Sequence, residues 1–384
     1  MESFVCTIKE KASGRAIAVP VFGDAESLAT LALCVKAISA ENVFCVHIDH
    51  GMLRKNEAEK INSYIKKLGI KNAKFIKCEY PFLLSTAKGK DGRVIGPLSS
   101  VCVPAEKREI ILFALERVYN EAVKSFNRND LAVFGSSSVG GESLIEIGER
   151  AAQIALDAGA DESLVRQPFP TQSLAIRMIC NDSVIALTTA QRDGLYSTVE
   201  RCSNEFSSRL VPLRSVGILN GERTYKSMAV LSHNGIKTDF EKAFEIADKI
   251  AEKLNYINRV VCRIDTDEHT YPYHCRPLHL CKSGLDILRI ADEVVAEEFK
   301  NTPAAQFFAV LLPLSANNEM QYSVVIRVIS TTDYKTARAL VPGKDFSLSV
   351  LKTAAGRIKT ELGESIDMVL YDITSKPPAA IEWE

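Results

Sequence analysis

The chain has 384 residues, of which 46% are hydrophobic and 25% charged, a composition typical of a globular protein with two or three domains. Its net charge is −1, so no basic field favours nucleic-acid binding. The first residues show no basic segment followed by an apolar stretch, and no apolar run approaches the roughly 20 residues that cross a bilayer. We therefore expect a cytoplasmic protein that binds neither nucleic acid nor membrane.

The cysteine pattern indicates a reducing compartment. The ten cysteines contain no Cys-x-x-Cys, and several lie in apolar runs, as Cys34 and Cys45 do, where a free thiol packs as a small hydrophobe. One cluster raises the question of zinc: His269, His274, Cys275, His279 and Cys281. Its spacing matches no standard zinc motif and its Tyr and Pro residues indicate a loop, so we expect no metal site.

The first part of the chain alternates strands with helices. We expect strands at 15–21, 43–49, 74–77 and 131–134, helices at 28–39, 57–68, 105–124 and 142–158, and a loop at 85–103. This alternation predicts a parallel sheet covered on both faces. Ligands of such sheets bind beyond the carboxyl ends of the strands, which places residues 22–27 and 50–56 at the expected site.

A second domain is expected from about residue 178. It combines a helix-rich stretch at about 226–300 with apolar strands and one further helix. We expect the strands at 258–261, 306–313, 322–328 and 368–371, and the helix at 350–362.

The last thirteen residues, 372–384, hold the only Trp of the chain, together with Lys376, Pro377-Pro378 and two Glu residues. Because Pro fixes φ, this segment is suited to hold an ammonium and a carboxylate at a fixed separation, as a small polar ligand requires. The alternative is a capping tail that packs Trp383 on the core and leaves its charges in water.

The tail closely resembles the C-terminus of GMP synthetases, where Lys-Pro-Pro and Ile-Glu-Trp-Glu help to bind XMP, and the resemblance covers nearly the whole chain. It implies a pyrophosphate-loop domain of the adenine-nucleotide alpha-hydrolase-like type over 1–177. It implies an α+β dimerisation and XMP-binding domain over 178–384, with the insert at about 226–300 resembling eukaryotic members. Carried over residue by residue, the XMP-binding groups are Arg223, Gln306, Lys376 and Glu382.

The ATP side departs from this family. Where GMP synthetases have Ser-Gly-Gly-x-Asp-Ser around the ATP phosphates, this chain has Phe22-Gly23-Asp24-Ala25-Glu26-Ser27. Phe22 fills space meant for phosphate oxygens, and Asp24 places a negative charge where an anion binds. One like-charge contact at ~4 Å costs on the order of 4 kcal/mol at an effective dielectric of ~20. We expect no ATP binding in the family's manner.

Two other segments of the chain match the family's sequence pattern more closely. The segment Ile48–Glu57 makes Asp49, Arg54 and Lys55 candidate ATP-side contacts, and Pro104–Ile111 does the same for Lys107 and Arg108. The alternative is that these are ordinary helix N-terminal residues.

After the fourth strand the family's Gln-Gly-Thr is replaced by Phe134-Gly135-Ser136. The residues of the family's mobile lid and magnesium site are missing. The stretch Ser136–Ser138 is either a replacement phosphate site or a plain loop.

Together the residues predict a catalytically degenerate paralogue, a pseudoenzyme with no catalytic residue assigned. It is expected to bind a purine nucleotide and to form a homodimer, or a heterodimer with a true GMP synthase. The second interpretation is an active ammonia-dependent GMP synthase that uses ATP and Mg²⁺, with no glutaminase domain before Met1. The third is an interaction protein that has lost both pockets.

Overall fold

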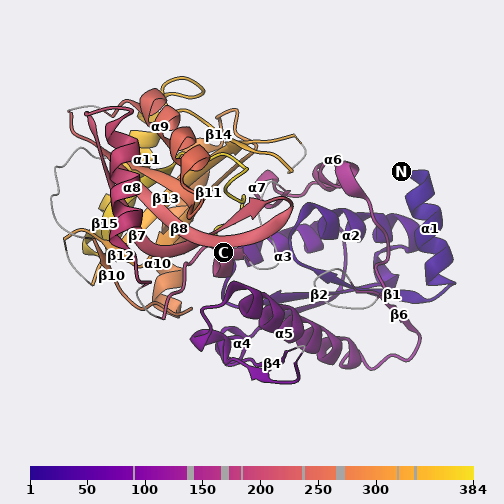
Figure 1. Ribbon diagram of the computed structural model, residues 1–384. Coiled ribbons are helices and arrows are strands. Elements are labelled where there is room, and N and C mark those ends of the chain that lie inside the picture. The colour runs from indigo at the N-terminus through magenta and orange to yellow at the C-terminus, as the bar shows by residue number, and fades with distance from the viewer. Residues whose placement is uncertain are drawn as a thin grey trace. The chain divides into compact units, whose positions relative to one another are not determined.

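The computed structural model describes residues 1–89, 91–135, 142–165, 173–182, 185–235, 238–264, 273–317, 320–332 and 335–384. They form two compact units, Met1–Ser173 and Leu174–Glu384, whose elements are labelled in Figure 1. The expected α/β class is confirmed, because the first unit holds a parallel sheet and the second a separate mixed sheet. The boundary expected at residue 177 lies a few residues beyond the end of the first unit.

The first unit is organised around four parallel strands in the order β3-β2-β1-β6. Every residue of β1 is buried, as in the centre of a sheet covered on both faces. The strands are β1 Ala16–Val21, β2 Val43–Asp49, β3 Asn72–Lys77 and β6 Leu131–Val133. The other elements are α1 Glu2–Ala12, α2 Ala25–Ile38, α3 Glu57–Lys67, α4 Glu79–Leu83, β4 Ala87–Lys88, β5 Val94–Ile95, α5 Pro104–Lys124, α6 Ala151–Asp157 and α7 Glu162–Val165.

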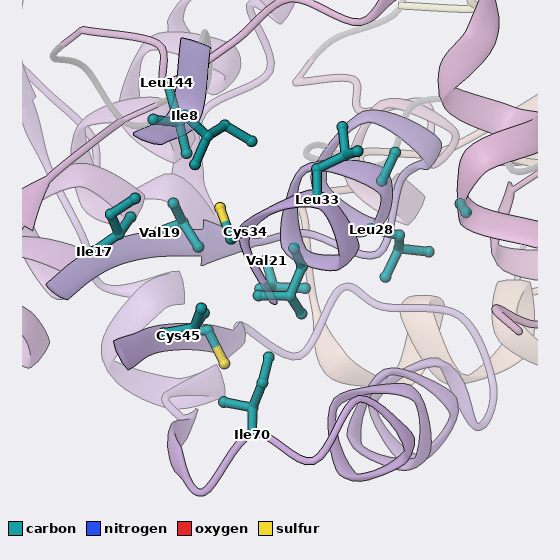
Figure 2. Packing of buried hydrophobic residues seen from close by; sticks show 14 of the residues in the cluster. Ile8, Ile17, Val19, Val21, Leu28, Leu33, Cys34, Cys45, Ile70 and Leu144 are labelled. Atoms are coloured by element: carbon teal, nitrogen blue, oxygen red, sulfur yellow. The ribbon is translucent and has the colours of Figure 1, made fainter. Parts of the chain in front are cut away.

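The main core of this unit lies between β1 and α2. Figure 2 shows Leu28, Leu33 and Cys34 of α2 gathered beside Val19 and Val21 of β1, and all of them are buried. On the opposite face α5 is fixed by the Tyr119 hydroxyl, which bonds to the carbonyl oxygens of Ala18 and Phe134 at 3.1 and 2.7 Å. The hydroxyl thereby joins α5 to β1 and to the end of β6.

The second unit is built on a mixed sheet in the order β11-β13-β15-β9-β8-β7, with β14 paired to β13. Its helices pack along the sheet in strand order: α10 on β11, α11 on β15, α9 on β9 and α8 on β7. The strands are β7 Phe206–Leu219, β8 Glu222–His233, β9 Ile257–Arg263, β10 His274–Cys275, β11 Gln306–Leu312, β12 Leu314–Ser315, β13 Tyr322–Ser330, β14 Arg338–Ala339 and β15 Ile366–Asp372. The helices are α8 Thr189–Glu200, α9 Phe240–Lys253, α10 Lys282–Phe299 and α11 Leu348–Leu362.

The helix expected over 142–158 is wrong in its first half. Residues 142–147 are not helical, and α6 begins only at Ala151. Gly148 takes a φ of +63°, which breaks the helical path, and Ile147 gives its N–H to a side chain of α2 instead of to a helix. The short hairpin β4–β5 in the expected loop and the helix α1 were not predicted.

The stretch from about 226 begins as a strand, because β8 continues to His233 before α9 and α10. No described helix is long and apolar enough to cross a membrane. The described residues include all ten cysteines, and none of these forms a disulfide.

Candidate functional site

The loop between β1 and α2 carries the predicted phosphate-loop residues, and their polar groups bond to one another. The Asp24 carboxylate accepts the Ser27 N–H at 2.6 Å and so caps α2. The Ser27 hydroxyl oxygen accepts the Phe22 N–H at 3.2 Å. Gly23 has a φ of +82°, a conformation that glycine adopts without strain. The N–H groups of Phe22 and Ser27, which a phosphate could otherwise use, are thus already bonded.

Asp24 stands where a helix N-terminus attracts anions. The partial positive charge there favours a carboxylate as it would a phosphate. Burial nevertheless raises the pKa of Asp24 above its usual value, and the charge of Glu26 raises it further, against the lowering effect of the bonds from Ser27. A second anion at this helix end would increase the free-energy cost of keeping negative charge there.

Glu26 connects the same loop to the segment that precedes α6. Its Oε1 accepts the Ile147 N–H at 2.6 Å, and Phe22 is buried. The remaining cavity measures about 80 Å³, and its lining includes Phe22, Asp24, Glu26, Ser27, Ser143 and Ile145. This cavity is small beside ligand pockets, which begin near about 300 Å³.

The residues after β2 are also engaged within the unit. The Asp49 carboxylate accepts the Gly51 N–H at 3.0 Å. Arg54 donates from Nη2 to the Ser163 carbonyl at 2.7 Å, and its N–H donates to Glu57 Oε2 at 2.9 Å. Arg54 therefore joins this loop to α7, whereas Lys55 is exposed.

At the start of α5, Lys107 has 0% of its surface exposed and Arg108 is half-buried. Lys107 thus belongs to the interior of the first unit. The candidate phosphate site at Ser136–Ser138 lies outside the described residues, as does the segment 166–172.

The C-terminal tail, defined as residues 373–384, is a buried part of the second unit. Trp383 has 0% of its surface exposed and Glu384 only 3%. The Glu384 carboxylate accepts the Cys180 N–H at 2.6 Å. The capping-tail alternative is therefore right about Trp383 but wrong about the charge of Glu384, which is not left in water.

Two buried arginines hold the tail by its carbonyl groups. Arg259 Nη2 donates to the carbonyl oxygens of Ala380 and Glu382 at 3.1 and 2.7 Å, and its guanidinium lies 4.3 Å from the Trp383 ring centroid. Arg327 donates to the carbonyl oxygens of Thr374 and Ala380 at 3.1 and 3.0 Å. The position of the tail backbone is therefore set by charge-assisted hydrogen bonds.

Asp372 neutralises one charge of this pair. Its carboxylate accepts from Arg259 Nη1 at 2.7 Å and also from Arg327, and all three side chains are buried. Burial acts to raise the pKa of Asp372, but the two guanidiniums outweigh it and the pKa lies below its usual value. Burial lowers the pKa of Arg259 to about 9, in opposition to Asp372.

The tail also pairs with β7 through the backbone. The Val216 N–H donates to the Trp383 carbonyl at 3.1 Å, and the Ile218 N–H donates to the Pro378 carbonyl at 2.8 Å. Between them Gly217 has no room for a side chain, since a Cβ would lie 2.5 Å from the Pro378 oxygen. This contact requires glycine because the two backbones approach so closely.

Of the four predicted XMP-binding residues, the structure brings Arg223 and Glu382 into contact. Arg223 Nη2 lies 2.8 Å from Glu382 Oε2 in a partly exposed ion pair. Lys376 pairs through its backbone with Ala337. Gln306 begins β11, four strand positions from β8, or about 19 Å at about 4.8 Å per strand. Its Oε1 is buried without a hydrogen-bond donor among the described residues.

The sequence interpretation missed Arg259, Arg327 and Asp372. A signal was present, because each is a charged residue within or next to a run of apolar residues typical of a buried strand. A charge in such a position is stable only when it is paired.

The comparisons with known proteins agree with this two-unit arrangement. Residues 292–383, which run from α10 to Trp383, match the GMP synthase C terminal domain. The C-terminal part of the second unit is therefore similar to that domain.

Similarity to individual proteins extends over nearly the whole chain, at low sequence identity. The chain is 26% identical to a glutamine-hydrolyzing GMP synthase of Dictyostelium discoideum, with 98% of this chain and 64% of the relative aligned. It is 26% identical to a probable glutamine-hydrolyzing GMP synthase of Leptospira interrogans (95% and 63%) and 22% identical to one of Caenorhabditis elegans (100% and 65%). The chain thus spans somewhat less than two thirds of these relatives' length. It is similar to GMP synthases over nearly all of its own length.

Proposed function

We propose that this chain is a catalytically degenerate GMP-synthase-like protein that binds a purine nucleotide such as XMP or GMP through its second unit. The observation that carries the proposal is the closed loop after β1. Asp24 caps the N-terminus of α2, and Glu26 accepts the Ile147 N–H beside the loop. The cavity that remains measures about 80 Å³. This arrangement supports the proposal that the loop does not bind ATP and Mg²⁺.

The second unit supplies the groups for a nucleotide. A phosphate is suited to the cation of Lys376, and a polar edge of the same ligand to the Arg223–Glu382 pair, whose charged atoms lie 2.8 Å apart. The Arg223–Glu382 ion pair is partly exposed, so a ligand can exchange with it at modest cost. The buried Gln306 oxygen without a donor is a polar atom that a ligand N–H would satisfy.

We also propose that the protein is cytoplasmic and acts as a dimer, either with a second copy or with a complete GMP synthase. The mixed sheet of the second unit ends in β7 and β11, and this unit serves for dimerisation in the family that the chain resembles.

The test is a calorimetric titration of the purified chain with XMP and, separately, with Mg-ATP. We expect saturable XMP binding and no ATP binding. Lys376→Ala should weaken XMP binding at least about tenfold, since a charge-assisted phosphate contact is lost. Lys352→Ala, an exposed lysine on α11, is the matched control and should bind like the parent chain.

Binding of both ligands would overturn the degenerate assignment and favour an ammonia-dependent GMP synthase. That outcome would be checked by GMP formation from XMP, ATP and ammonia. Binding of neither ligand would leave an interaction protein and contradict the nucleotide proposal.

A further inference from the structure

A second pocket lies in the Leu174–Glu384 unit, and neither Arg223 nor Glu382 is among the residues that line it. The β7–β8 hairpin extends beyond β9, because the pairing of β8 with β9 begins only at Ser227. The space beside this extension is bounded by residues 185–187 ahead of α8 and by the turn at Asn255 and Tyr256. It encloses about 450 Å³, within the range of about 300–1,000 Å³ typical of small-molecule sites.

The lining combines positive charge with aromatic and apolar surface. Two cations, two aromatic residues and two leucines are among the residues that line the space: Arg214, Lys226, Tyr225, Tyr256, Leu187 and Leu219. Among the described residues that line it there is no carboxylate. The pocket is therefore electrostatically suited to an anion and sterically suited to a flat or apolar body.

The two cations differ from Arg177 and Arg357 of this unit, which are engaged in ion pairs. Arg177 pairs with Asp292, and Arg357 pairs with Glu297, Glu298 and Glu361. Within the part of the chain that the structure describes, the side chains of Arg214 and Lys226 make no hydrogen bond or ion pair. Their donors are available to a ligand.

One aromatic wall is fixed in place. The Tyr256 hydroxyl donates to the Gln191 carbonyl at 2.7 Å, so its ring is held between α8 and the start of β9. The Ser227 N–H, which donates to the Tyr256 carbonyl at 3.1 Å, holds the same turn. A ring so anchored offers a stacking surface that costs little conformational entropy on binding.

We propose that this pocket binds a small organic phosphomonoester with a planar ring, of the size of a nucleoside monophosphate. The phosphate is held by Arg214 and Lys226, and the ring lies against Tyr225 and Tyr256. The site is separate from the nucleotide site proposed above, since none of Arg223, Gln306, Lys376 and Glu382 lines it.

The experiment titrates the purified chain carrying Lys376→Ala, which weakens the other proposed site, with AMP, GMP, CMP and UMP. Adenosine and inorganic phosphate are the partial ligands. We expect at least one nucleotide to bind more tightly than either partial ligand, and its affinity to fall as salt rises. Arg214→Gln and Lys226→Gln should each weaken binding about tenfold, and Tyr225→Ala should weaken it as well.

The matched controls are Arg201→Gln and Lys352→Gln, which remove the same charges from exposed positions of the same unit and should leave binding unchanged. Thermal unfolding of each variant shows whether the unit is folded; Arg214 is exposed, so its loss should not prevent folding. The proposal is wrong if no nucleotide binds at about 1 mM, or if inorganic phosphate binds as tightly as the nucleotides. It is also wrong if the Gln variants in the pocket bind like the controls.

Discussion

At the scale of single residues, the second unit depends on three charges that water does not reach. Arg259, Arg327 and Asp372 form one network with four carbonyl oxygens, of Thr374, Val216, Ala380 and Glu382. Because the network spans β9, β13 and β15 as well as the tail, it couples the tail to the centre of the sheet.

We predict that Asp372→Asn destabilises the second unit by about 3–5 kcal/mol, because two buried guanidiniums lose the charge that compensates them. Urea unfolding at neutral pH measures the change. Asp286→Asn, which breaks exposed ion pairs with Lys282 and Arg289, is the control and should cost at most about 1 kcal/mol. An equal effect of the two substitutions would contradict the assigned role of the network.

The same substitution has a pH signature. The pKa of Asp372 in the folded chain lies below the ordinary value of 3.8, so the carboxylate contributes stability above pH 3.8 that is lost as the pH falls through the folded pKa. The stabilities of the parent chain and of Asp372→Asn should therefore converge below pH 3.8.

From the sequence alone we predicted which residues at the tail are candidates for binding, but not which contacts hold the tail in place. The resemblance identified Arg223 and Glu382, which the structure brings together. It could not reveal that the tail is held by Arg259 and Arg327, because that depends on the register of strands far apart in the chain. The same limitation applies to Arg54, whose bond to Ser163 joins residues more than a hundred positions apart.

At the scale of elements, the loop after β1 and the helix α2 decide what the first unit binds. The strand and the helix were predictable from periodicity, and β2 was placed at its observed bounds. The non-helical stretch 142–147 was not predictable, because its conformation follows from a tertiary bond between Ile147 and Glu26 and from the φ of Gly148.

We predict that Asp24→Asn stabilises the first unit relative to the parent chain as the pH rises above 3.8. The folded-state pKa of Asp24 is raised, so the parent chain loses stability as the pH rises from 3.8 through that pKa. Asn keeps an oxygen for the Ser27 N–H but carries no charge. Urea unfolding at a series of pH values gives the difference between the two chains.

Asp130→Asn serves as the control for this series, because the hydrogen bond from Arg128 lowers the pKa of Asp130 and reverses the sign. For that substitution the parent chain should gain stability as the pH rises toward 3.8. A difference between Asp24→Asn and its parent that does not vary with pH would contradict the account of the loop.

At the scale of the whole molecule, the chain is two units with separate cores, Met1–Ser173 and Leu174–Glu384. Domains of this size commonly unfold as separate cooperative transitions. In the proposed function, the second unit binds the nucleotide, and the loop after β1 in the first unit binds no phosphate.

We therefore predict two transitions in differential scanning calorimetry, of which XMP raises only one. Ligand at about 100 times its Kd stabilises the unit that binds it by about 2.7 kcal/mol. Asp372→Asn, which acts within the second unit, identifies the transition that should move. A shift of the other transition by XMP, or of either by Mg-ATP, would be incompatible with the proposed division of roles.

The pairing of the tail with β7 also has a consequence for biosynthesis. The Ser215 hydroxyl donates to the Trp383 carbonyl, a residue 168 positions later in the chain. While the ribosome makes the intervening segment, the free edge of β7 and the polar groups of Arg259 and Arg327 lack their final partners. An unpaired strand edge of this kind recruits other chains, so the nascent protein is most prone to aggregation just before its last strand and tail emerge.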